Sequence, residues 1–320
     1  MAHEVQTMAY INAKLWHGLG NRLTPNQPIE VWQQQAGMDW QIKETDVLYS
    51  VSDGDGDGLH LKSNPDSRVL FRSDNHALLS VVSKRYNIVQ PHDVLEFYRD
   101  LVSVGGFQLE TAGVLRGGKR LWALAKTGQE IILRGGDTVK AYLLLATSCD
   151  GTLATTAQFT SVRVVCNNTL QMAVANADRS IKVPHSTQFD PVLVKQALGI
   201  GLTAWGDFIG DIKALADRKV EKFEATSYFV NVLGDPTLPL AEQPNQKALQ
   251  TVQKLFLGNG MGSAMPSANG TAWGLLNGIT EYVDHHRRAR SQDSRMDSAW
   301  FGKGAIIKER AYAEAMKMVA

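Results

Sequence analysis

The residues best suited to hold a charged ligand form a short basic turn near the middle of the chain. Arg116, Lys119 and Arg120 flank two glycines, Gly117 and Gly118. Adjacent glycines accept the positive φ that tight hairpins require. Cations on such a turn can grip a phosphate backbone, although a purely solvated basic turn has the same composition. We therefore predict a hairpin tip that binds phosphates, and a solvated turn is the alternative.

Residues near this turn would extend it into a groove for single-stranded DNA. Trp122 offers an aromatic face for a base, and Lys126 offers a further phosphate contact. The segment 155–161 is rich in hydroxyl and amide groups, which donate to phosphate and sugar. Arg163 lies among valines, so it must be paired or must line a groove. The predicted DNA contacts are Arg116, Lys119, Arg120, Trp122, Lys126, Arg163, Arg287 and Arg288.

A second cluster of polar side chains has the composition of a metal site. Glu281, Asp284 and His285 fall close together in a predicted helix over 271–290, with His286 alongside. Two carboxylates and an imidazole would suit manganese or zinc, as in a metal-dependent nuclease or another hydrolase. The arginines that follow would equally make this an ordinary ion-paired helix. We keep the hydrolase as an alternative and assign no metal-binding or catalytic residues.

The region after this cluster is basic. Between His285 and Arg310 there are seven Lys or Arg residues and three Asp or Glu residues. The formal net charge of the whole chain is only +1, so attraction to nucleic acid has to come from local patches of this kind. Arg287 and Arg288 are included among the predicted DNA contacts for this reason.

The alternating Asp-Gly segment 53–58 resembles the start of a calcium-binding loop. Asp53, Asp55 and Asp57 have the right spacing, but the twelfth position is Asn64 instead of glutamate. No helical pattern flanks the segment. We therefore predict an exposed acidic hairpin turn without bound calcium.

Motifs of the common enzyme classes are absent from the sequence. There is no Walker A pattern, no dinucleotide fingerprint, and neither a Gly-x-Ser-x-Gly nor a His-Glu-x-x-His motif. We expect a binding protein without a cofactor. Cys149 and Cys166 fall in adjacent predicted strands, and two thiols in so long a chain fit buried residues in a reducing cytosol. No apolar run approaches the roughly 20 residues of a membrane span, so a cytoplasmic location is expected.

The elements that position these residues form a regular block over 90–177. Residues two apart share one face of a strand, and the apolar residues of this block alternate accordingly. The predicted elements are a helix over 90–102, strands over 107–115, 119–126, 139–148 and 152–165, and a helix over 169–177 capped by Asn167 or Asn168. The fold class is α+β, with an antiparallel β-meander flanked by helices and followed by a mainly helical C-terminal region.

Composition changes along the chain suggest three regions. An N-terminal arm covers 1–40 and contains His17, which could act as a base or ligand but is more typical of a docked anchor. The α+β core with the basic hairpin covers 41–178, with short strands over 40–51 and 69–72. The mainly helical region covers 179–320, with a long helix over 191–216 and a proline-rich linker near 234–245.

Several motifs resemble a family of phage/plasmid-like proteins, which is classified as a domain of unknown function. The motifs are Trp16-His17-Gly18-Leu19-Gly20, Arg163-Val164-Val165-Cys166-Asn167-Asn168-Thr169-Leu170, Thr280-Glu281-Tyr282-Val283-Asp284-His285 and Ser298-Ala299-Trp300-Phe301-Gly302. The resemblance implies a setting on phages, plasmids or integrative elements and supplies no catalytic residues.

A second resemblance concerns architecture alone. A helix, a basic hairpin, further strands and a closing helix are similar to the core of single-strand annealing proteins. That likeness implies a ring or filament that holds DNA by its backbone. We therefore expect a homo-oligomeric single-stranded DNA-binding and annealing protein that acts in phage or plasmid homologous recombination. A host-directed anti-defence interaction protein is a further alternative.

Overall fold

The centre of the molecule is a large sheet in which almost all neighbouring strands are antiparallel. The computed structural model describes residues 7–11, 20–52, 59–171, 180–199 and 204–320. Within these residues the strand order is β10-β9-β8-β7-β6-β1-β2, and β11 also pairs with β9. The strands are β1 (Thr7–Ile11), β2 (Asn21–Leu23), β6 (Gln108–Leu115), β7 (Arg120–Leu133), β8 (Asp137–Ser148), β9 (Thr155–Arg163), β10 (Asn168–Gln171) and β11 (Ile181–Val183).

The predicted β-meander is confirmed. β6 and β7 form a hairpin that pairs Leu115 with Arg120, and β8 lies between β7 and β9. The turn between β6 and β7 is one turn of 3-10 helix, and Gly117 and Gly118 have the positive φ values expected of them, 71° and 101°. Among the strands of the described residues, only β1 and β2 pair in parallel. The α+β class follows from this sheet and from the concentration of helices toward the C-terminus.

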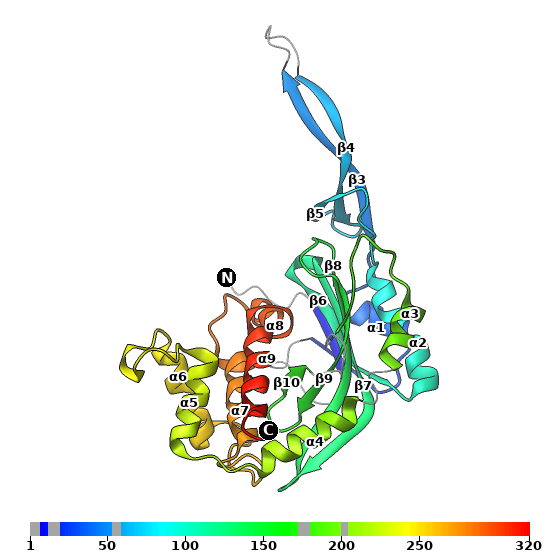
Figure 1. Ribbon diagram of the computed structural model, residues 1–320. Coiled ribbons are helices and arrows are strands. Elements are labelled where there is room, and N and C mark those ends of the chain that lie inside the picture. Colours follow the sequence, from blue (N-terminus) through cyan, green and yellow to red (C-terminus); the bar gives the residue numbers. More distant parts are fainter. Residues whose placement is uncertain (1–6, 12–19, 53–58, 172–179, 200–203) are drawn as a thin grey trace.

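Helices lie on both sides of the sheet (Figure 1). On one side α2 is fastened by Tyr98, whose hydroxyl donates to the carbonyl of Ala123 at 2.8 Å. On the other side the C-terminal helices pack together and against β10. The helices are α1 (Ile29–Gln35), α2 (Pro91–Gly105), α3 (Pro191–Gly199), α4 (Ala204–Asp217), α5 (Lys222–Leu233), α6 (Gln246–Lys254), α7 (Ala272–Glu281), α8 (Gln292–Phe301) and α9 (Lys303–Met316). No helix in these ranges is both long and apolar enough to cross a membrane.

A separate three-stranded sheet projects from the body (Figure 1). It consists of β3 (Ile42–Ser52), β4 (Leu59–Arg72) and β5 (Leu78–Ser83). The predicted strand over 69–72 is only the inner end of β4, because the polar outer residues and Pro65 conceal the strand pattern in the sequence. The predicted acidic turn over 53–58 lies outside the described residues, and so does His17.

Two predicted helices are wrong. The segment after Cys166 does not begin a helix over 169–177: Asn167 has a φ of 54° and reverses the chain, so that β10 pairs with the end of β9. Asn167 is thus a turn residue instead of a helix cap, and 172–177 lie outside the described part of the chain. The helix predicted over 191–216 is wrong as a single helix: α3 packs against β9 and β11, whereas α4 packs against α7, and the residues between them lie outside the described part of the chain.

Candidate nucleic-acid interface

The basic turn is docked on helix α8, which places its cations in different environments. Arg120 is 4% exposed and forms an ion pair with Asp297, while its second terminal nitrogen donates to the Thr152 hydroxyl at 2.8 Å. Its guanidinium also lies 5.3 Å from the centre of the Phe301 ring. The predicted phosphate contact at Arg120 is therefore corrected: this side chain is a buried link between β7 and α8.

The other two cations of the turn remain at the surface. Arg116 is exposed, and its Nε lies 3.8 Å from a carboxylate oxygen of Asp297. The backbone N–H of Arg116 donates to Asp293 at 3.3 Å, which holds the turn against α8. Lys119 is half-buried. Arg116 and Lys119 are thus the residues of the turn that can still meet a ligand.

Trp122 is a core residue. It has no exposed surface, and its ring lies edge-on to Trp300 of α8 with the two centroids 4.9 Å apart. The predicted stacking of Trp122 on a base is corrected accordingly, because no face of the ring is open. Lys126 lies at the other end of the hairpin, where its Nζ is 2.7 Å from a carboxylate oxygen of Glu110.

Arg163 is buried and paired. It is 2% exposed, and its Nε donates to Asp137 at 2.8 Å. A terminal nitrogen donates to the carbonyl of Gly262 at 3.0 Å. Asp137 accepts two further hydrogen bonds, from the Ser267 hydroxyl at 2.6 Å and the Trp273 indole at 3.1 Å. The expectation that Arg163 lines a DNA groove is therefore corrected: it joins β8 and β9 to the segment that leads into α7.

The residues of the alternative hydrolase hypothesis have separate partners. Asp284 accepts from Lys308 at 2.8 Å and from the backbone N–H of Thr169 at 2.8 Å. Glu281 accepts from the backbone N–H of Met261 at 3.0 Å, and burial raises its pKa. His285 Nε2 lies 3.0 Å from the carbonyl of Cys166. Across the described ranges, no three His, Cys, Asp or Glu residues are grouped to hold a metal ion.

The two cysteines are buried and unbonded to each other, as predicted from the sequence. Burial raises the pKa of Cys149 and of Cys166 to about 12. Thiols with such values are protonated at neutral pH, and it is the thiolate that reacts as a nucleophile. Neither cysteine is therefore a candidate nucleophile.

What the fold does bring together is a group of arginines around a pocket of about 230 Å³ beside α8. The members of this arginine cluster are Arg287, Arg288, Arg290 and Arg295. Ser294 and Ser298 of α8 line the same pocket. Among the residues that the structure describes, no carboxylate forms an ion pair with any of these arginines. The cluster is consequently a local concentration of uncompensated positive charge.

The cluster is built partly by its own hydrogen bonds. Arg295 donates to the carbonyls of His285 and Arg287, at 2.7 and 2.8 Å. Arg287 donates to the Ser298 hydroxyl at 2.8 Å. These bonds fix the connection between α7 and α8, whereas the side chains of Arg288 and Arg290 are exposed. Two arginines therefore shape the pocket, and two remain available to a ligand.

Helix α8 separates the arginine cluster from the basic turn. Asp293 and Asp297 are four residues apart on one flank of the helix and face the turn. Ser294 and Ser298 lie on the adjacent flank and face the cluster. The sequence analysis predicted Arg287 and Arg288 as DNA contacts together with the turn residues. In the structure these two arginines and the turn lie against adjacent flanks of helix α8.

Arg290 and Arg295 were not among the predicted contacts. Both belong to the basic region after His285, and the local excess of Lys and Arg there was the sequence signal that could have identified them. The sequence suggested a helix through residue 290, with Arg295 beyond its end. In the structure the helical turns end at His286, and Arg287 has an extended backbone with a ψ of 132°. The resulting loop gathers the arginines around one pocket.

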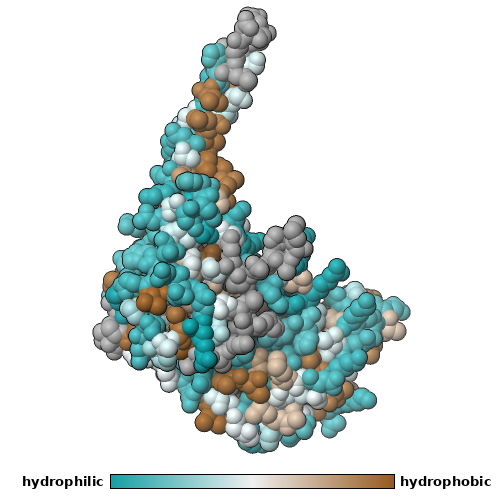
Figure 2. Space-filling view, turned by 180° about the vertical axis from the view of Figure 1, so that it is seen from behind, coloured by the Kyte–Doolittle hydropathy of each residue, from teal (hydrophilic) through white to brown (hydrophobic). Residues whose placement is uncertain are grey.

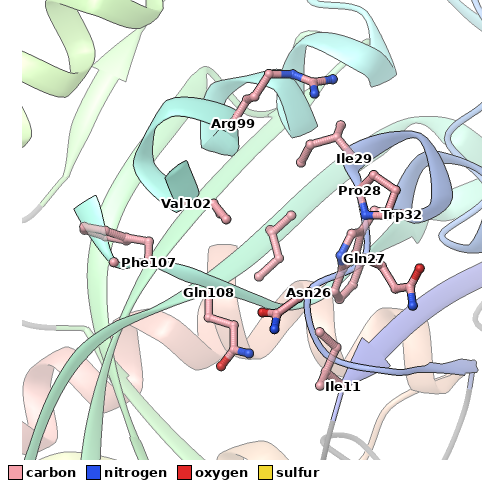
Figure 3. Close-up of a pocket in the computed structure, with 12 residues that line it drawn as sticks. Ile11, Asn26, Gln27, Pro28, Ile29, Trp32, Arg99, Val102, Phe107 and Gln108 are labelled. Carbon is pink, nitrogen blue, oxygen red and sulfur yellow. The ribbon is translucent and has the colours of Figure 1, made fainter. Parts of the chain in front are cut away.

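A second pocket lies elsewhere, between α1, α2 and the start of β6 (Figure 3), and has a volume of about 500 Å³. Its walls include Trp32, Phe107 and Gln108. Arg99 lies at its rim, but it is held by Glu96 and Glu30 at 2.6 and 2.7 Å. Among the described residues that line it, this pocket therefore presents no uncompensated charge of the kind found in the arginine cluster.

A family model described as "Domain of unknown function (DUF932)" matches residues 78–300. This range runs from β5 to α8, so it includes both the basic turn and the arginine cluster. No curated protein and no solved structure matches the chain.

Proposed function

Because the chain belongs to the DUF932 family, a domain of unknown function, its role must be inferred from its own residues, and we propose that it binds single-stranded DNA by the phosphate backbone at the arginine cluster. Bound DNA would follow helix α8 from the cluster toward Arg116 and Lys119. The chemistry invoked is binding alone, since no catalytic group is required.

The observation that supports this proposal most strongly is that four arginines surround one pocket. Among the described residues, none of these arginines forms an ion pair with a carboxylate. A guanidinium has a planar fork of donors that matches the oxygens of a phosphate, and it is always charged near neutral pH. Arg287 and Arg295 are held in place by hydrogen bonds, so less conformational freedom is lost on binding. A pocket of about 230 Å³ is large enough for a phosphate group.

Two neighbouring features favour the same ligand. The pocket lies beside the N-terminal turn of α8, where backbone N–H groups and the helix dipole attract anions. Arg116 and Lys119 add positive charge on the adjacent flank of that helix. Together these groups would contact successive phosphates and not a single isolated anion.

Backbone contact is also what an annealing function needs. A strand that is held by its phosphates keeps its bases free to pair with a complementary strand. Trp122 is buried, so base stacking at that position has no part in the proposal. We extend the proposal to annealing by a homo-oligomer, which rests on the architectural likeness to single-strand annealing proteins. The setting in homologous recombination of phages or plasmids rests on the resemblance of the sequence motifs.

The first test is a salt series with the double variant Arg288→Ala/Arg290→Ala. Both side chains are exposed, so the fold should be unaffected. We expect the plot of log affinity against log salt to become shallower by about 0.7 for each lost phosphate contact, or roughly 1.4 in total. Fluorescence anisotropy with a labelled oligonucleotide measures this, and mixing complementary oligonucleotides measures annealing.

The matched control is Lys247→Ala/Lys254→Ala, which removes the same charge from exposed positions on α6. This variant should keep the wild-type slope, because its lysines lie far from α8 (Figure 1). Absence of binding by the wild-type protein at low salt would refute the proposal. Equal slopes for the two double variants would refute the assignment to the arginine cluster.

A further inference from the structure

The outer half of the projecting sheet is a ribbon of only two strands. Leu48–Ser52 of β3 pairs with Leu59–Ser63 of β4, and we call this segment the outer arm. Strand β5 pairs with β4 only between Ser67 and Phe71, nearer the body. Two-stranded ribbons are marginally stable in water, and three or more strands with an apolar face are needed for independent stability.

The outer arm displays large apolar side chains on both faces. Leu48 and Leu61 are 56% and 70% exposed, and Tyr49 is 50% exposed. Register places Leu48 and Leu61 on one face, whereas Tyr49 lies opposite Lys62 on the other. Figure 2 shows hydrophobic residues along the length of the projection. A surface of this kind is typical of a region that becomes covered by another chain.

The two edges of the outer arm differ in how they could pair. In the described part of the chain β3 pairs only with β4, so its other edge has unpaired N–H and C=O groups. The outer residues of β3, Val47-Leu48-Tyr49-Ser50-Val51-Ser52, include no charge, proline or glycine. The edge of β4 has Lys62 and Pro65, which are residues that discourage edge pairing.

We propose that the outer edge of β3 pairs antiparallel with the same edge of a second copy of this chain. An uncharged strand is compatible with itself about a two-fold axis, because no like charges come opposite each other. A pairing centred near Tyr49 would place Val47 of one copy opposite Val51 of the other. The product is a four-stranded sheet, β4-β3-β3-β4, which removes the instability of the isolated ribbon.

This inference identifies the outer edge of β3 as the subunit interface of the proposed homo-oligomer, so it rests on the oligomer part of the proposed function. The arms project from the body, so pairing through them leaves the arginine cluster open (Figure 1). Two copies would then present two clusters to DNA. Self-association and DNA binding are measured separately, so either can fail without the other.

The test uses the full chain and sedimentation velocity over a range of protein concentrations. The variant Leu48→Lys/Tyr49→Lys places cations on both faces of β3, where they repel their own copies across the two-fold axis. We expect the dimer dissociation constant to rise at least about 100-fold. The control is Phe223→Lys on α5, which changes an even more exposed apolar residue of the body and should leave the dimer intact.

A cross-linking experiment locates the contact independently. In Tyr49→Cys the new thiol is exposed, whereas the native cysteines are buried, so a short bismaleimide should join two chains through residue 49. In Leu61→Cys, on the far strand of the ribbon, cross-linking should be much slower. A wild-type protein that stays monomeric, or equal cross-linking at both positions, would overturn the proposal. The Leu48→Lys/Tyr49→Lys variant should be monomeric and should keep the wild-type slope of log DNA affinity against log salt. That result would support both the dimer interface and the DNA-binding site, as two separate properties of the chain.

Discussion

Replacing Arg163 with alanine is expected to lower the free energy of unfolding by about 3–5 kcal/mol, because the substitution leaves Asp137 buried without its countercharge. Asp137 is 1% exposed, so water cannot take the place of the guanidinium without rearrangement. The Gly262 carbonyl would also lose its donor. The two hydrogen bonds from Ser267 and Trp273 do not replace a full positive charge. Urea unfolding measures the loss as a lower midpoint with an unchanged slope.

Two comparisons make this result specific. Arg116→Ala removes an exposed arginine whose nearest carboxylate oxygen is 3.8 Å away, and the expected loss is below about 1 kcal/mol. Arg163→Lys keeps a positive charge beside Asp137 and should lose less stability than the alanine variant. If Arg163→Ala unfolded like the wild-type protein but bound DNA more weakly, Arg163 would belong to a DNA groove after all.

The main lines of the fold could be predicted because they depend on local patterns. Alternating apolar residues and the glycines of the 116–120 turn were sufficient for the β6–β7 hairpin. The amphipathic stripe and early Pro91 were sufficient for α2. These signals involve residues that are close in sequence, so no knowledge of distant partners was needed.

The candidate site was harder to predict because it depends on distant partners. The acid that pairs with Arg120 is 177 residues further along the chain, at Asp297. A sequence pattern around residue 120 cannot distinguish an arginine that meets such an acid from one that meets solvent. The same is true of Arg163, because the sequence could not decide whether this arginine pairs with an acid or lines a groove. Arg288 and Arg290 are exposed because the chain leaves the helical path at Arg287, which no local propensity indicated.

The motifs that resemble the phage/plasmid-like family have a structural explanation. Thr169 of one motif donates to Asp284 of another, and His285 lies against the Cys166 carbonyl. Trp300 of a third motif packs on Trp122. These motifs meet at the junction between the sheet and the C-terminal helices. Packing and buried charge therefore explain these residues of the three motifs.

The strongest test of that junction is Asp284→Ala, which should lower the free energy of unfolding by about 3–5 kcal/mol. Lys308 is 3% exposed, and its ammonium group would keep only the hydroxyl of Thr169 at 2.7 Å. The backbone N–H of Thr169 would lose its acceptor as well. A role in metal-dependent hydrolysis would instead predict a folded variant of normal stability.

The same variant has a distinctive dependence on pH. Burial lowers the pKa of Lys308, and Asp284 opposes that shift by stabilising the charged form. Without Asp284 the folded-state pKa should fall further below the unfolded value near 10.4. The unfolded chain then binds a proton that the folded protein has released, so stability rises with pH across this window. We expect Asp284→Ala to gain more stability than the wild-type protein between about pH 7 and pH 9. Adding Lys308→Met should abolish this gain, and a gain that persisted in the double variant would assign it to another group.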